Sequence, residues 1–242
     1  MKEEKGLFDL RARIGLMVPS LNTAMEPELN GMAPNGVSFY AARMRIKSTT
    51  EEHLLEMAKR AKAAAQDLAD TDPDLLVYGC TSGSFVKGAN WEEELIKDLE
   101  IISGTKVIST SGAIVKAIRA LGKSRISIAT PYIDEINDLA KGFFNEVGFN
   151  VVDIRGLGCF RKGEIRSISY QQVYRLAKSV ITSETELLLL SCTEMRTAKI
   201  LRQLEEDLLL PVLSSNQAVL WAALRSCGLK DCLSQYGMIF EV

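Results

Sequence analysis

The sequence predicts an α/β protein built from two similar lobes, each a mainly parallel sheet flanked by helices, with the active site in the cleft between the lobes. Three observations support this prediction. Short apolar runs alternate with helical patterns, the runs are apolar on both faces, and the pattern of the first half recurs in the second. The chain has 242 residues, of which 47% are hydrophobic and 25% charged, as expected for one or two globular domains.

Eight apolar runs predict the strands. They are Arg13–Val18, Val37–Met44, Asp74–Tyr78, Lys106–Ser109, Arg125–Thr130, Phe149–Arg155, Glu186–Ser191 and Pro211–Ser215. Helical spacing of apolar residues predicts Glu51–Leu68, Gly112–Leu121, Glu135–Glu146, Gln171–Thr182, Met195–Glu206 and Gln217–Cys227 as helices. This alternation is typical of parallel sheets, because each connecting helix returns the chain to the start of the next strand.

Three of the strand segments recur at one constant spacing. The segment RIGLMVPS from Arg13 matches RISIATPY from Arg125, an offset of 112 residues. The same offset relates GVSFYAAR to GFNVVDIR and DLLVYGCT to ELLLLSCT. We therefore infer duplicated lobes at 12–110 and 111–220, with the tail 221–242 packing back on the first lobe.

The residue counts argue against several classes of function. With 29 basic and 31 acidic residues the net charge is −2, which argues against nucleic-acid binding and against a polybasic membrane surface. No apolar run approaches the length of a membrane span. His53, the single histidine, excludes a two-histidine metal site and is expected to be a solvated residue of a first helical turn. For this reason no metal is expected. Gly156–Gly158 lacks the third glycine of a dinucleotide-binding motif, so no cofactor is expected either.

The five cysteines predict reduced thiols rather than disulfides. Their number is odd, and the N-terminal MKEEKGLFDL has no apolar core of a signal peptide, so a cytoplasmic location is expected. Cys159, Cys227 and Cys232 do not lie at repeated strand ends. We expect no function for these three.

Cys80 and Cys192 occupy the same position of the repeat, each after an apolar strand and before a threonine. For a single cysteine at such a position, a role as a small buried apolar residue is as common as a functional role. Two cysteines at equivalent positions favour a functional role. Across a cleft, one thiol adds to a substrate carbon or removes a proton while the other donates a proton. The turn TSGSF after Cys80, and a helix expected in TEMRTAKIL after Cys192, offer N–H groups that lower thiol pKa values.

Polar side chains follow the same strand ends and suit a small carboxylic acid as ligand. The set comprises Ser20, Asn22, Thr81, Ser82, Tyr132, Thr193 and Ser214–Asn216. Helix capping is the alternative role for Ser20, Thr193 and Ser214.

The motifs RIGLMVPSLNT, GCTSGSFVKG, ATPYIDEIN, LLLSCTEMRT and VLSSNQAVLWAALR together resemble those of the aspartate/glutamate racemase superfamily, in its branch of maleate isomerases and arylmalonate decarboxylases. The resemblance covers nearly the whole chain. It implies two pseudo-symmetric lobes and cofactor-independent chemistry beside a carboxylate. For a maleate isomerase it implies that Cys80 adds to the double bond and that Cys192 donates and removes the proton. It implies carboxylate binding by Asn22, Thr81, Ser82, Tyr132 and Thr193.

Two residues depart from the maleate isomerase pattern. Lys162 stands where the branch often has asparagine, and its cation is expected to pair with a distal substrate carboxylate or to face solvent. Glu194 follows Thr193 directly. If Glu194 faces the cleft, it repels a dianion or binds an amino group, which favours an amino-acid substrate.

Four functions follow from the sequence. The first is a cis-trans isomerase of a small unsaturated diacid, and the second is a racemase of amino acids or hydantoins with the same two thiols. The third, an arylmalonate decarboxylase, is disfavoured because the resemblance implies glycine at the position of Cys80. The fourth is a non-catalytic protein that binds a small acid. A homodimer or homotetramer is expected.

Overall fold

The computed structural model describes residues 10–242. The expectation that the chain lacks a signal peptide concerns its first residues, and nine of them lie outside the described part. No helix within residues 10–242 combines the length and the apolar character that crossing a membrane requires.

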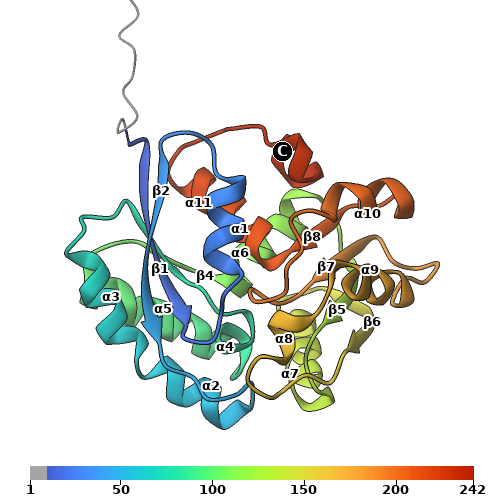
Figure 1. Cartoon of the computed structure of the whole chain (residues 1–242), viewed down its shortest axis with the longest axis horizontal. Coiled ribbons are helices and arrows are strands. Elements are labelled where there is room, and N and C mark those ends of the chain that lie inside the picture. Colours follow the sequence, from blue (N-terminus) through green and yellow to red (C-terminus); the bar gives the residue numbers. More distant parts are fainter. Residues whose placement is uncertain (1–9) are drawn as a thin grey trace, which may run out of the picture.

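Two parallel four-stranded sheets form the framework (Figure 1). The first contains β1 (Ala12–Pro19), β2 (Val37–Met44), β3 (Leu75–Tyr78) and β4 (Val107–Ser109), in the order β2-β1-β3-β4. The second contains β5 (Arg125–Thr130), β6 (Asn150–Gly156), β7 (Leu187–Leu190) and β8 (Val212–Ser214), in the order β6-β5-β7-β8. Both sheets thus have one topology, which confirms the predicted fold class of two repeated α/β lobes; the exact lobe boundaries stay a prediction.

Helices connect the strands and cover the sheets. In the first half they are α1 (Met25–Met32), α2 (Glu51–Ala58), α3 (Ala61–Ala69), α4 (Thr81–Phe85), α5 (Ala89–Ser103) and α6 (Thr110–Ala120). In the second half they are α7 (Asp134–Glu146), α8 (Glu164–Ser167), α9 (Tyr170–Ser179), α10 (Leu201–Leu208) and α11 (Ser215–Ser226), followed by the 3-10 turns η1 (Ser234–Tyr236) and η2 (Met238–Glu241).

The central strands explain why the sequence shows continuous apolar runs. Every residue of β3 and of β7 is buried. A parallel strand with helices over both sheet faces needs apolar side chains on both sides, so its sequence does not alternate. Cys80 and Cys192 follow these two strands at their carboxyl ends, which places both thiols at the functional edge of a sheet.

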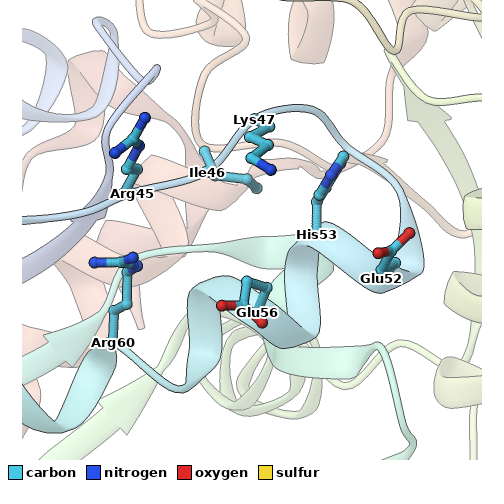
Figure 2. Close-up of a pocket in the computed structure, with 7 residues that line it drawn as sticks. All are labelled: Arg45, Ile46, Lys47, Glu52, His53, Glu56 and Arg60. Atoms are coloured by element: carbon cyan, nitrogen blue, oxygen red, sulfur yellow. The ribbon is translucent and has the colours of Figure 1, made fainter.

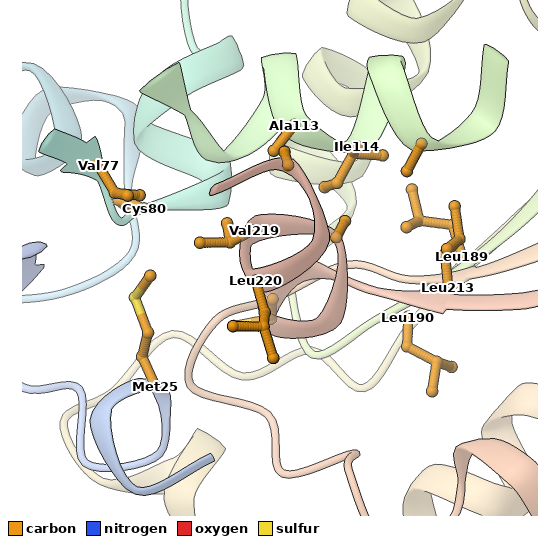
Figure 3. Packing of buried hydrophobic residues seen from close by; sticks show 14 of the residues in the cluster. Met25, Val77, Cys80, Ala113, Ile114, Leu189, Leu190, Leu213, Val219 and Leu220 are labelled. Carbon is orange, nitrogen blue, oxygen red and sulfur yellow. The ribbon is translucent and has the colours of Figure 1, made fainter. Parts of the chain in front are cut away.

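Helices α6 and α11 pack against each other where the two sheets meet. Each begins directly after the last strand of its sheet. Figure 3 shows Ala113 and Ile114 of α6 beside Val219 and Leu220 of α11, within one apolar cluster that extends to both sheets. The core is therefore continuous between the lobes, which fixes their relative position.

Two predicted elements were wrong in detail. The helix predicted over Met195–Glu206 begins only at Leu201. The backbone N–H groups of Thr197 and Ala198 donate instead to Glu28 of α1, at 2.6 and 2.9 Å. The helix predicted over Glu51–Leu68 is interrupted after Ala58, so that α2 and α3 are separate.

The last residues of the chain form the 3-10 turns η1 and η2. The Tyr236 hydroxyl donates to the Gly31 carbonyl after a separation of 205 residues, at 2.9 Å. The N–H of Met238 donates to Glu205 at 3.1 Å. The tail thus contacts both halves of the molecule.

Glu28 is a buried carboxylate that joins the two halves. It lies on α1 and is 8% exposed. Besides Thr197 and Ala198, it accepts a hydrogen bond from Asn216 Nδ2 at 2.8 Å. A carboxylate surrounded by donors in this way stabilises an irregular backbone segment that could not otherwise be buried.

We predict that Glu28→Ala lowers the free energy of unfolding by about 3 kcal/mol, because buried N–H donors lose their acceptor. Denaturant unfolding monitored by circular dichroism measures this change. The control is Glu26→Ala on the same helix, which removes an exposed ion pair with Arg43 and should cost no more than about 1 kcal/mol. Equal losses in the two variants would contradict the role of Glu28.

Candidate active site

A narrow pocket between the lobes brings the two predicted thiols together. Its volume is about 40 Å³. Seven of the predicted site residues line it, namely Asn22, Cys80, Thr81, Ser82, Tyr132, Cys192 and Thr193. Pro19, Leu21, Ile46, Thr49, Leu54, Ile165 and Glu194 complete the lining. The pocket therefore has neutral polar walls from both lobes and one carboxyl group.

Ser20 and Lys162 were predicted as substrate-binding residues, but the structure does not place them in this lining. Ser20 is exposed, and its hydroxyl accepts a hydrogen bond from the Ile46 N–H at 3.1 Å, so it supports the neighbouring loop. Lys162 is exposed in the turn before α8. Ile165, three residues further on, lines the pocket instead.

The Cys80 thiol is held at the start of α4. Its Sγ accepts from the Gly83 N–H at 3.3 Å, and the Ser82 hydroxyl lies 3.9 Å away. Gly83 permits this arrangement, since a Cβ atom there would lie 3.0 Å from the sulfur. Cys80 is 6% exposed, and burial raises the pKa of its thiol to about 11, although both neighbouring donors lower it.

The Cys192 thiol has a similar setting in the second half. Its Sγ accepts from the Glu194 N–H at 3.4 Å, and the Tyr132 hydroxyl lowers its pKa. Cys192 is 5% exposed, and burial raises the pKa of this thiol to about 12. The expectation of lowered thiol pKa values was therefore wrong, because desolvation outweighs the local hydrogen bonds in both cases.

Tyr132 is positioned by the end of β5. Its N–H donates to the Thr130 hydroxyl at 3.1 Å, and its carbonyl accepts from the Gly158 N–H at 3.1 Å. A Cβ atom on Gly156 would lie 2.1 Å from the Tyr132 carbonyl oxygen, so glycine is required at that position. Burial raises the pKa of Tyr132 well above its ordinary value, which keeps the phenol neutral beside the thiols.

Hydrogen bonds between the lobes fix the remaining polar walls. Asn22 Nδ2 donates to the Thr193 hydroxyl at 2.9 Å, and its Oδ1 accepts from the N–H groups of Ala24 and Met25. The Thr81 hydroxyl donates to Ser215 at 2.9 Å. These side chains are consequently held in place before any ligand enters.

Of the three residues for which helix capping was the alternative role, only Ser214 caps a helix. It accepts from the Gln217 N–H at the start of α11. The Thr193 hydroxyl donates to the Gly79 carbonyl at 3.3 Å, and Ser20 contacts Ile46 as described above.

Glu194 presents a carboxyl group to the same pocket. Its Oε1 atom is buried and has no hydrogen-bond partner among residues 10–242. Burial raises the pKa of Glu194 to about 7, and the opposing effect of Arg166 is weaker. Part of the Glu194 population therefore carries a proton at neutral pH.

A larger cavity of about 530 Å³ (Figure 2) shares the lining residue Ile46 with the pocket. Its lining comprises Arg45, Ile46, Lys47, Glu52, His53, Glu56 and Arg60. His53 Nδ1 lies 2.7 Å from the Ser48 hydroxyl, and the residue is not in the lining of the two-thiol pocket. The larger cavity has charged side chains but no thiol, so the narrow pocket is the candidate active site.

Sequence reasoning missed several residues of the pocket wall. Thr49 and Leu54 lie in a loop and in α2, and Ile46 follows β2. All three lie beyond the segments that match between the two halves, so the pattern that identified the thiols did not include them. In the segment before α8, the charged Lys162 was chosen as the substrate-binding residue, so the apolar Ile165 was not considered.

Comparison with known proteins places the chain among related enzymes. A family model described as arylmalonate decarboxylase matches residues 14–240. The chain is 29% identical over 239 residues to maleate isomerase of Nocardia farcinica, covering 95% of each protein. It is 25% identical over 217 residues to arylmalonate decarboxylase of Bordetella bronchiseptica, covering 89% of this chain and 90% of that one.

A solved structure agrees with these sequence comparisons. It is a mutant of the Nocardia farcinica maleate cis-trans isomerase with a covalently bound succinylcysteine intermediate, and it matches with a TM-score of 0.90 and 28% identity over 95% of this chain and 98% of that one. Together the comparisons confirm the resemblance to the branch of maleate isomerases and arylmalonate decarboxylases.

The burial of the thiols predicts their reactivity in the free protein. At pH 7.5 we expect iodoacetamide to modify the exposed Cys232 much faster than Cys80 or Cys192, because only the thiolate reacts and burial disfavours it. Peptide mapping by mass spectrometry gives the rate at each cysteine. Faster modification of Cys80 than of Cys232 would show that the thiol is ionised despite its burial.

Proposed function

This chain belongs to the arylmalonate decarboxylase family, and we propose that within the family it is a cofactor-independent cis-trans isomerase of maleate or a closely similar small diacid. The observation that carries the proposal is the pair of buried thiols, Cys80 and Cys192, in one narrow pocket between the lobes. The maleate isomerase relative and the succinylcysteine intermediate of its solved structure support the same chemistry.

In the proposed reaction, the Cys80 thiol passes its proton to a carboxylate of the bound diacid, and the resulting thiolate adds to one carbon of the double bond. The electron pair moves toward the adjacent carboxylate, and the other olefinic carbon takes a proton from the Cys192 thiol. The central bond of the resulting succinyl-cysteine is single, so it rotates. Cys192 then removes a proton from the carbon that it protonated. Elimination of the Cys80 sulfur, which takes back its proton from the substrate carboxylate, leaves the trans product with the enzyme unchanged.

Neutral donors are suited to hold the substrate during these steps. Asn22, Thr81, Ser82, Tyr132 and Thr193 line the pocket and are 1–3% exposed. We assign them to carboxylate binding, because preorganised hydroxyl, amide and backbone donors stabilise the charge that develops on the carboxylate during addition. They cost little reorganisation, since contacts such as that from Asn22 to Thr193 already fix them.

The two thiols separate the decarboxylase from the isomerase, but not the racemase from the isomerase. A decarboxylase of the kind implied by the resemblance has glycine in place of Cys80, so the second thiol favours isomerisation over decarboxylation. A racemase uses the same two thiols to remove and return a proton on opposite faces of one carbon. Homo-oligomerisation, a cytoplasmic location and the absence of nucleic-acid partners stay predictions.

The proposal predicts fumarate formation from maleate. Purified protein is incubated in D₂O separately with maleate, with aspartate or glutamate, and with phenylmalonate, and each mixture is followed by proton NMR. The expected outcome is conversion of maleate alone. Deuterium at Cα of an amino acid would identify a racemase instead, and loss of CO₂ from phenylmalonate a decarboxylase. No change in any mixture would contradict the proposal and favour a binding protein.

Both thiols should be essential for turnover. We expect Cys80→Ala and Cys192→Ala each to lower kcat/KM by about 10³-fold or more, because each removes one of the two groups that act together. The matched control is Cys232→Ala, which replaces an exposed thiol outside the pocket and should retain wild-type kinetics. Retained activity in either pocket variant would exclude the two-thiol mechanism.

A further inference from the structure

Glu194 is a negative group in a pocket proposed to bind a dianion. Among the described lining residues it is the single carboxyl group, and none of the others is lysine, arginine or histidine. An ionised Glu194 would therefore oppose a substrate carboxylate with no cation in the wall between them. Like charges at close range in a buried site strongly disfavour binding.

The Glu194 side chain has an unused hydrogen-bonding position that a ligand in the pocket could occupy. Its Oε1 atom is buried and unpaired within residues 10–242, although most buried polar atoms in proteins are hydrogen-bonded. The pocket into which it faces also contains both thiols. A substrate carboxylate in this pocket meets a hydrogen-bond donor if Glu194 carries a proton, and a repelling charge if it does not.

We propose that Glu194 is a specificity-determining residue that admits a dicarboxylate dianion only in its protonated form and then donates a hydrogen bond to one substrate carboxylate. This inference rests on the proposed function, because it takes a small diacid as the ligand. In the reaction Glu194 neither gains nor loses a bond to carbon. It holds its proton while the substrate is bound.

The surrounding groups make Glu194 the one that titrates near neutrality. Burial raises its pKa to about 7, and Arg166 on α8 lowers it by a smaller amount. The thiols of Cys80 and Cys192 and the phenol of Tyr132 also face the pocket, and burial raises all three pKa values far above this range. Since a raised carboxyl pKa means protonation below it, dianion binding is favoured below pH 7 and weakens above it.

The expected pH dependence is steep. Above the pKa of the free enzyme, binding of a dianion requires uptake of one proton, so the Kd rises by about tenfold for each pH unit. Ionisation of Glu194 is expected to change the Kd, whereas ionisation of the thiols changes kcat. A monoamide of the diacid avoids the penalty, since its amide group can donate to ionised Glu194.

The first test measures the binding of succinate, a saturated diacid that cannot react. Isothermal titration calorimetry between pH 7 and 9, in buffers of different ionisation enthalpy, gives both the Kd and the protons taken up. We expect the Kd to rise about 50-fold over this range, with uptake increasing from about half a proton at pH 7 toward one proton at pH 9. A Kd that stays constant with pH, or binding without proton uptake, would overturn the inference even if no variant folds.

The second test uses Glu194→Gln, which keeps the shape and a hydrogen-bond donor but cannot ionise. Its Kd for succinate and its KM for maleate should stay constant between pH 7 and 9. The control is Glu206→Gln on the exposed face of α10, paired with Arg202 in the native chain, which should keep the wild-type rise. If Glu194→Gln also keeps that rise, another group titrates and the inference is wrong.

A substrate comparison completes the test. In the wild-type enzyme the KM ratio of maleate to its monoamide, maleamate, should increase with pH, whereas in Glu194→Gln it should stay constant. A wild-type ratio independent of pH would overturn the inference. Absence of maleate turnover together with pH-dependent succinate binding that Glu194→Gln abolishes would reject the proposed isomerisation and support the role of Glu194.

Discussion

Burial of polar groups where the two halves meet is the constraint on which the rest of the structure depends. Glu28 reaches from α1 to the N–H groups of Thr197 and Ala198, and Asn22 reaches to Thr193. These partners are about 170 residues apart in the chain, so the lobes must lie in one register for any of the bonds to form. The same register aligns the thiol-bearing strand ends. Packing of α6 on α11 adds the apolar part of the junction, and the pocket is a consequence of both.

The framework could be predicted because its signals are local and repeated. The runs DLLVYG and ELLLLS became β3 and β7, buried over their whole length. The constant offset predicted two similar lobes, and the two sheets have one strand order. The start of α10 could not be predicted in this way. Apolar residues in Met195–Ile200 have helical spacing, but the N–H groups of Thr197 and Ala198 in this segment donate to Glu28, a residue distant in sequence. Long-range satisfaction of backbone groups can override local propensity, and no window of sequence contains that information.

The site shows the same division between local and distant signals. Residues at repeated strand ends, such as Cys80, Cys192 and Tyr132, were expected in the pocket and line it. Ser20 also follows a strand, yet its hydroxyl accepts from Ile46 and holds a loop. Position along a strand predicts which edge a side chain reaches, whereas the rotamer and the loop around it decide whether it faces a ligand. The pKa values were harder still, because burial depends on the whole fold.

The raised pKa values of the two thiols, the Tyr132 phenol and the Glu194 carboxyl group have one physical cause, which is burial. A closed pocket with two thiols, a phenol and a carboxyl group costs least free energy when all four are neutral, since each charge would be desolvated without a counter-ion. A dianionic substrate then supplies the charge, and the donors around Asn22 and Thr193 are already in place to receive it. Charging Cys80 in advance would raise the cost of substrate entry. We infer that its thiolate forms within the substrate complex, so that the free enzyme does not bear the desolvation cost of a buried thiolate.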